Sequence, residues 1–146
     1  MDINSILKGI DCGCGKKHVC DIEFVYIENG AINRLKELYT DKKNILIVAD
    51  ENTYGAAGEK VEKALEGRNV NKVVFDGNTV LIPDERAIER VKANIDGTEL
   101  IVGIGSGVIQ DLCKYVSHFE KIPYIIVATA PSKKYVFSLF KFTIIY

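Results

Sequence analysis

Residues 100–132 read LIVGIGSGVIQDLCKYVSHFEKIPYIIVATAPS, and this stretch decides the fold class of the chain. Two continuous apolar runs, at residues 100–104 and 124–127, have the length and composition of buried strands. Between them, a glycine turn opens a segment with helical periodicity over residues 108–119. A strand, a glycine turn, a helix and a second strand form the order in which an α/β domain builds a phosphate-binding edge.

The alternation of strands and helices extends toward the N-terminus. Strand patterns at residues 23–27, 44–49 and 73–75 alternate with helical patterns at residues 31–39 and 52–66, and with a helix that Asp84 opens and that ends near Gly97. The run at 44–49 is apolar on both faces, which is typical of a parallel strand covered by helices. The sequence therefore predicts an α/β fold with an open, largely parallel Rossmann-like sheet, helices on both faces and ligands at the carboxyl ends of the strands.

Composition narrows the range of partners. The 146 residues suit one domain with a real core, and the net charge of −1 gives no reason to expect a nucleic acid or an anionic membrane as partner. The N-terminus is acidic and lacks the apolar region of a signal peptide, and no apolar run reaches the roughly 18 residues of a membrane helix. We therefore expect a cytoplasmic protein whose four cysteines are reduced.

The glycine turn is the first candidate site. Gly103, Gly105 and Gly107 alternate between a buried strand and a helix, so that the backbone can approach an anion at the helix N-terminus. Ser106 would donate a further hydrogen bond. The spacing differs from both G-x-G-x-x-G and the Walker loop, and a tight turn that binds nothing is the alternative.

Polar residues after two other strands point to the same edge. Asp50 ends a buried strand, where a carboxylate can accept hydrogen bonds from a ribose or, alternatively, cap the next helix. Thr129 and Ser132 follow the last buried strand, where their hydroxyls either reach the same crevice or form a plain turn.

A separate cluster near the N-terminus contains metal-ligating residue types. Cys12, Cys14, His18 and Cys20 follow a C-x-C-x-x-x-H-x-C pattern of thiols and an imidazole, which are donors that zinc selects. The C-x-C spacing is tighter than that of a zinc ribbon, and a reduced extension without metal is the alternative. Cys113, beside an apolar residue of the predicted helix, is interpreted as a core residue.

Several motifs together resemble the dehydroquinate synthase-like superfamily, which includes iron-containing alcohol dehydrogenases and glycerol dehydrogenases. They are residues 105–111 (GSGVIQD) with Lys114 and Tyr115, Pro123-Tyr124 leading to residues 129–132 (TAPS), and the start at residues 12–18 (CGCGKKH). The sn-glycerol-1-phosphate dehydrogenase branch is the most similar, and the resemblance covers nearly all of residues 12–132.

The resemblance implies an NAD(P)-dependent oxidoreductase that interconverts dihydroxyacetone phosphate and glycerol 1-phosphate, a small phosphorylated polyol. It implies that the glycine turn faces the pyrophosphate, that Asp50 meets the adenosine ribose, and that Thr129 and Ser132 line the nicotinamide side. The turn residues concerned are Gly105, Ser106, Gly107 and Val108. It also implies a divalent metal, zinc or nickel, held by an aspartate and two histidines of a C-terminal helical domain.

The last residues depart from the family pattern. Aligned without gaps, Lys134 falls at a substrate-contacting aspartate and Tyr135 at a glycine, whereas Ser138 matches a cofactor-facing serine. We expect an N-terminal extension (1–22), a dinucleotide-binding domain (23–132) and an aberrant apolar tail (133–146) produced by a frameshift or truncation, with the family's C-terminal helical domain absent.

Three readings follow from this departure. The chain is the cofactor-binding half of a dehydrogenase and inactive alone, a stand-alone non-catalytic nucleotide-binding module, or a non-functional fragment. The apolar tail favours aggregation, or it adds a strand at the sheet edge. The cofactor choice between NAD and NADP and the formation of a homo-oligomer stay open.

Overall fold

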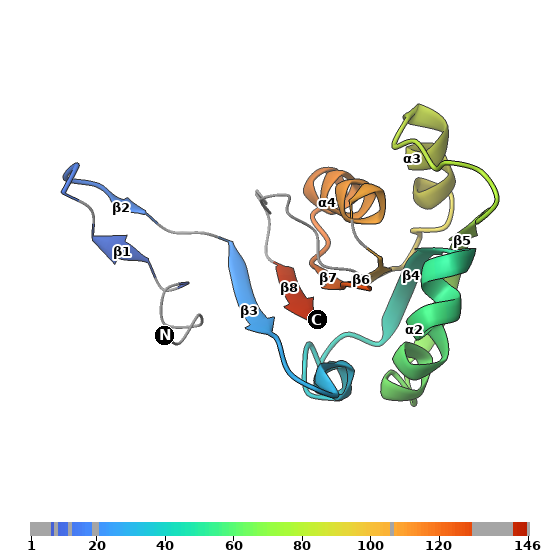
Figure 1. Cartoon of the computed structure of the whole chain (residues 1–146), viewed down its shortest axis with the longest axis horizontal. Coiled ribbons are helices and arrows are strands. Elements are labelled where there is room, and N and C mark those ends of the chain that lie inside the picture. The colour runs from blue at the N-terminus through green and yellow to red at the C-terminus, as the bar shows by residue number, and fades with distance from the viewer. Residues whose placement is uncertain are drawn as a thin grey trace.

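The computed structural model describes residues 7, 9–11, 13–18, 21–105, 107–129 and 142–145 of the chain. Its centre is a six-stranded sheet in which every pairing is parallel. The strands lie in the order β3-β8-β7-β6-β4-β5 (Figure 1). Their bounds are β3 Ile22–Tyr26, β4 Asn44–Asp50, β5 Asn69–Phe75, β6 Leu100–Ile104, β7 Tyr124–Val127 and β8 Phe142–Ile145. This confirms the predicted open parallel sheet.

Helical elements cover both faces of the sheet, as predicted. They are the 3₁₀ helix η1 Ala31–Lys36 and the α-helices α2 Glu51–Ala64, α3 Glu85–Lys92 and α4 Val108–Glu120. One core cluster unites η1 and α2 with one face of the sheet, and the other unites α3 and α4 with the opposite face. Within the described residues, no helix combines the length and apolarity that crossing a membrane requires.

Strand β4 shows why the sheet needs two helical layers. Ile45 and Ile47 belong to the cluster of η1 and α2, whereas Leu46 and Val48 belong to the cluster of α3 and α4. All four side chains are at most 2% exposed. Because successive side chains of a strand point to opposite faces, a continuous apolar run is stable only between two layers.

Three elements differ from their predicted form, and one of them is α3, which ends at Lys92 rather than near Gly97. The helix expected over residues 31–39 is the six-residue 3₁₀ helix η1, with three-residue hydrogen bonds such as that from Asn33 N to Gly30 O at 2.9 Å. Strand β5 begins at Asn69 rather than at Val73, because it pairs residue by residue with β4. Strand β5 lies at the edge of the sheet, where polar side chains are tolerated. Because its first half contains polar residues, the apolar pattern of the sequence did not indicate a strand there.

The C-terminal strand takes a position that the sequence did not indicate. We expected the tail either to aggregate or to extend the sheet edge, but β8 lies between β7 and β3 and pairs with both. The edge position is therefore wrong: β3 occupies that edge, and in the described part of the chain β3 joins the sheet only through β8. The Ile145 side chain is fully buried.

A short hairpin precedes the sheet. Strands β1 (Ile10–Asp11) and β2 (Lys17–His18) pair antiparallel, and Figure 1 shows them set apart from the six-stranded sheet.

Candidate functional site

The sheet changes its winding direction between β4 and β6. Strand β4 leads through α2 to β5 on one side, whereas β6 leads through α4 to β7 on the other side. Helices α2 and α4 cover opposite faces, so their N-termini diverge from the carboxyl ends of these neighbouring strands (Figure 1). Such a switch point is where open α/β sheets bind their ligands. We call this place the switch-point crevice.

The N-terminus of α4 has the features of an anion-binding position. Its N-cap is Gly107, with φ 54° and ψ −108°, and no side chain of the described residues caps the helix with a hydrogen bond. A Cβ placed on Gly107 would meet no atom of the described structure within 4 Å, so the described residues leave the space beside it open. Free N–H groups and the positive end of the helix dipole favour a phosphate at such a position.

Gly105 and Gly103 have a different task from Gly107. Gly105 has φ 146°, and a Cβ there would lie 3.0 Å from Cγ1 of Ile109. A Cβ on Gly103 would lie 2.7 Å from Sγ of Cys113, which is impossible without a shift. These two glycines let α4 pack closely on β6, which leaves Gly107 as the glycine that opens space for a ligand.

Asp50 caps helix α2, as the alternative interpretation of its position predicted. Its Oδ1 accepts a hydrogen bond from Thr53 N at 2.8 Å, and its own N–H donates to Thr53 Oγ1 at 3.1 Å. The residue is half-buried at the carboxyl end of β4. Contact with a ribose stays a prediction, and the cap holds the carboxylate at the crevice where that contact would be made.

Thr53 is a crevice residue that the sequence interpretation missed. Its methyl carbon lies 3.4 Å from the Cβ position of Gly105, so it bridges the two turns that form the crevice. The signal was present in the D-x-x-T spacing of residues 50–53, which matches the form of a capping box.

The next loop is tied to the start of α2. Glu51 Oε2 accepts a hydrogen bond from Gly77 N at 3.1 Å, and Asn52 Nδ2 donates to Gly77 O at 2.9 Å. Hydrogen bonds from the backbone and then the side chain of Asn78 hold the pKa of Asp76 below its usual value. The carboxyl end of β5 is therefore fixed beside that of β4.

The other predicted cofactor residues divide into two groups. Val108 begins α4, and half-buried Thr129 follows β7, the strand beside β6. Ser106, Ser132 and Ser138 lie outside the described residues, as do Lys134 and Tyr135. The structure thus brings Asp50, Gly105, Gly107 and Val108 to one crevice, with Thr129 at the end of the adjoining strand.

The predicted metal cluster is described in part. Cys14 Sγ and His18 Nε2 lie 3.1 Å apart in the β1–β2 hairpin, whereas Cys12 and Cys20 lie outside the described residues. Nowhere in the described ranges do three His, Cys, Asp or Glu side chains converge as metal ligands. Cys113 is a core residue, as predicted, and its complete burial raises the pKa of its thiol.

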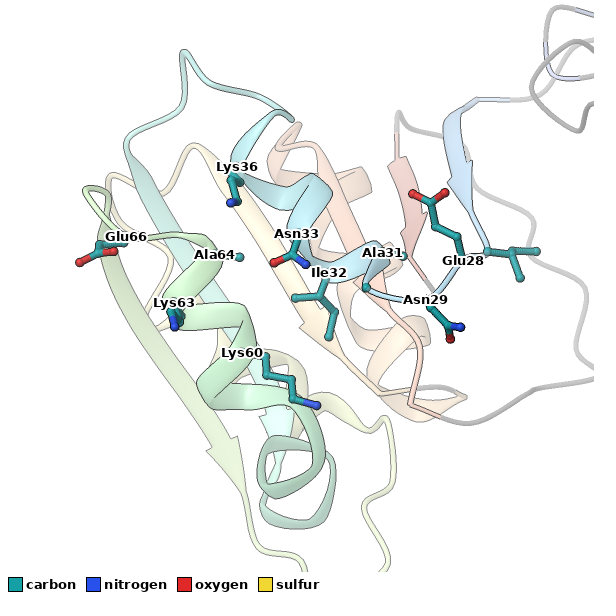
Figure 2. Close-up of a pocket in the computed structure, with 12 residues that line it drawn as sticks. Glu28, Asn29, Ala31, Ile32, Asn33, Lys36, Lys60, Lys63, Ala64 and Glu66 are labelled. Carbon is teal, nitrogen blue, oxygen red and sulfur yellow. The ribbon is translucent and has the colours of Figure 1, made fainter.

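A groove lies away from the switch-point crevice. It is a groove of about 760 Å³ between α2 on one side and η1 with its preceding turn on the other (Figure 2). Lys36, Lys60 and Lys63 line it together with Glu28 and Glu66. No sequence motif indicated this groove, because its residues come from two elements that only the packing of η1 on α2 brings together.

The sequence is similar to a known family and to proteins of that family. Residues 26–137, more than half of the chain, match the family described as iron-containing alcohol dehydrogenase. A glycerol-1-phosphate dehydrogenase [NAD(P)+] of Geobacillus stearothermophilus is 33% identical over 129 residues, which are 83% of this chain and 32% of that protein. One of Methanococcoides burtonii is 34% identical over 74% of this chain and 31% of its own length.

The fold was compared with solved structures. Glycerol dehydrogenase from Schizosaccharomyces pombe aligns with a TM-score of 0.63 and 19% identity, covering 86% of this chain and 37% of that one. Maleylacetate reductase from Agrobacterium tumefaciens aligns with the same TM-score at 18% identity, over 87% of this chain and 41% of that one. At these identities the likeness concerns the fold. The chain spans about a third of the length of the curated relatives that it matches.

Proposed function

Because this chain belongs to the iron-containing alcohol dehydrogenase family, we propose that its switch-point crevice binds the dinucleotide NAD or NADP. The turn at residues 105–108 would hold the pyrophosphate, and Asp50 would accept a hydrogen bond from the adenosine ribose. Thr129 and Ser132 are assigned to the nicotinamide side, and Ser138 is assigned to the cofactor without a stated side.

One observation carries this proposal. Of the two helices that begin at the crevice, α2 is capped by its own Asp50. In the described part of the chain, α4 begins at Gly107 without a side-chain cap and with no atom within 4 Å of a Cβ placed there. A negatively charged cap and a phosphate would compete for the same N–H groups. The anion of the cofactor is therefore assigned to α4, and the carboxylate to a sugar hydroxyl.

The proposed reaction is hydride transfer between the nicotinamide and a small phosphorylated polyol, with dihydroxyacetone phosphate and glycerol 1-phosphate as the pair. The support is the similarity to two glycerol-1-phosphate dehydrogenases [NAD(P)+] at 33% and 34% identity. In this reaction the nicotinamide supplies or accepts the hydride. The residues of the crevice bind and orient the cofactor.

The divalent metal that the family resemblance implies is not assigned to the crevice. The described residues gather no set of three ligands there, and we derive no step through a metal. We propose that a polypeptide of these 146 residues binds the cofactor and does not turn over dihydroxyacetone phosphate.

Calorimetry with NADH and NADPH, together with a turnover assay on dihydroxyacetone phosphate, tests the proposal. We expect one dinucleotide per chain and no turnover. Turnover would contradict the proposed inactivity, and the absence of binding by a folded, monodisperse sample would contradict the cofactor site and favour a non-functional fragment.

The matched variants are Gly107→Ala and Gly67→Ala. Both glycines have positive φ, at 54° and 87°, and at both a Cβ meets no atom of the described structure within 4 Å. Alanine strains the backbone at either site, but only Gly107 lies at the N-terminus of α4. We expect Gly107→Ala to weaken dinucleotide binding and Gly67→Ala to leave it unchanged; equal affinities would overturn the assignment.

A further inference from the structure

Thr53 makes a reciprocal set of hydrogen bonds with Asp50 at the start of α2. Its Oγ1 accepts a hydrogen bond from Asp50 N at 3.1 Å and donates one to Asp50 O at 3.2 Å. Its backbone N–H donates to Asp50 Oδ1 at 2.8 Å. A single residue therefore holds both the backbone of Asp50 and one oxygen of its carboxylate.

These contacts leave one carboxylate oxygen of Asp50 available to a ligand. Within the described residues, Asp50 Oδ1 is bound by Thr53 N, whereas Oδ2 accepts no hydrogen bond. The Thr53 hydroxyl has one proton, and it is used in the bond to Asp50 O. Thr53 is therefore suited to hold Asp50 rather than to donate to a ligand itself.

The methyl group of Thr53 supports the orientation in which these bonds form. Threonine is β-branched, so its χ1 angle has few accessible values. Thr53 Cγ2 lies 3.4 Å from the position that a Cβ on Gly105 would take, in the turn after β6. The hydroxyl thus faces Asp50 while the methyl group faces the glycine turn, and one side chain spaces the two sides of the crevice.

Helix α3 shows that a helix of this chain begins without such a residue. Asp84 caps α3, its Oδ1 accepting a hydrogen bond from Ala87 N at 3.0 Å. Ala87 has no hydroxyl that could return a hydrogen bond to Asp84. Capping alone therefore does not require threonine at this position, and the additional bonds of Thr53 occur at the helix that begins at the crevice.

We propose that Thr53 is a positioning residue of the dinucleotide site, which holds Asp50 so that its Oδ2 accepts a hydrogen bond from a ribose hydroxyl. This inference rests on the proposed function, which assigns the ribose to Asp50. Without the Thr53 hydroxyl, the N–H of half-buried Asp50 loses its acceptor. The carboxylate then loses the backbone orientation from which it would meet the ribose.

The test compares ADP with dideoxy-ADP, which lacks both ribose hydroxyls, by calorimetry on the full chain. The ratio of the two dissociation constants measures the ribose contact, whereas a general loss of structure weakens both nucleotides equally. We expect the unmodified chain to bind ADP about tenfold more tightly than dideoxy-ADP, the equivalent of one hydrogen bond to a charged group. Asp50→Asn and Thr53→Val should each lower this ratio toward one.

Further variants separate positioning from stability. Thr53→Ala also lacks the hydroxyl and favours a helix, so it gives the same test if Thr53→Val does not fold. Thr53→Ser keeps the hydroxyl and should keep most of the ratio. Asp84→Ala removes the cap of α3 and should lower the free energy of unfolding without changing the ratio.

The outcomes distinguish this inference from the function on which it rests. A ratio that Asp50→Asn lowers, but that folded Thr53→Val and Thr53→Ala leave unchanged, would overturn the positioning role alone. Equal affinities for ADP and dideoxy-ADP in the unmodified chain would overturn the proposed ribose contact and this inference with it. Circular dichroism and urea denaturation establish that each variant is folded during the measurement.

Discussion

Asp50 has two roles, capping of helix α2 and the proposed contact with the ribose, and substitutions can separate them. Its side chain caps α2, and asparagine caps a helix about as well as aspartate does. Asp50→Asn should therefore leave the free energy of unfolding nearly unchanged while weakening dinucleotide binding. Asp50→Ala should weaken binding and also cost about 1 kcal/mol of stability.

The matched control for this prediction is Asp84. It caps α3 through the corresponding hydrogen bond, its Oδ1 accepting from Ala87 N at 3.0 Å, but α3 does not begin at the crevice. Asp84→Ala should lower the free energy of unfolding by a similar amount and leave NADH affinity unchanged. If Asp50→Asn binds NADH as the unmodified chain does, the carboxylate has no cofactor role.

A second prediction for single residues concerns a pH-dependent ion pair on the surface, between Lys72 and Glu62. Lys72 Nζ donates to Glu62 Oε1 at 2.7 Å, which lowers the pKa of Glu62, assisted by a hydrogen bond from Tyr54. A carboxyl group with a lowered folded-state pKa stabilises the fold above its unfolded pKa and loses that contribution as the pH falls through the folded value.

Glu62→Gln should therefore be less stable than the unmodified chain at neutral pH, by less than about 1 kcal/mol because the pair is partly exposed. The difference should vanish in acid, below the folded-state pKa of Glu62. Urea denaturation over a series of pH values measures it. A difference that stays constant into acid would assign the effect to packing rather than to charge.

At the scale of elements, the packing of β8 shows whether the C-terminal segment is part of the folded sheet. Ile145 is fully buried, whereas Ile82, in the loop before α3, is 63% exposed. Ile145→Ala should cost about 2–5 kcal/mol of unfolding free energy, and Ile82→Ala should cost little. Chemical denaturation compares the two, and equal small effects would show that β8 does not pack in the sheet.

Sequence patterns predicted most elements, but not the position of β8. The strands at 44–50, 100–104 and 124–127 have dense apolar runs because helices cover both of their faces. Half of β5 was missed because its edge position tolerates polar side chains. The insertion of β8 between β7 and β3 depends on pairing across long sequence separations, which a local pattern does not encode.

The candidate site was predictable to a similar degree. The glycine turn and Asp50 stand at strand ends in the sequence, so their meeting at one crevice follows from parallel strand order. Thr53 was missed although its capping-box spacing was visible. The separate tasks of Gly103, Gly105 and Gly107 became evident only from the atoms around each Cα.

At the scale of the whole molecule, two places offer positive charge to an anionic ligand. The switch-point crevice has an uncapped helix N-terminus and a carboxylate, and the groove between η1 and α2 has three lysines. A cofactor with a pyrophosphate could be attracted by either, since both offer positive charge to an anion. The account depends on the crevice being the binding site.

The most direct test is to map the backbone amide resonances of the isotope-labelled chain during titration with NADH. We expect the largest saturable shifts at the N–H groups of Gly105, Gly107 and Val108, with Asp50 among the next. Saturable shifts confined to Lys36, Lys60 and Lys63, with the glycine turn unchanged, would contradict it.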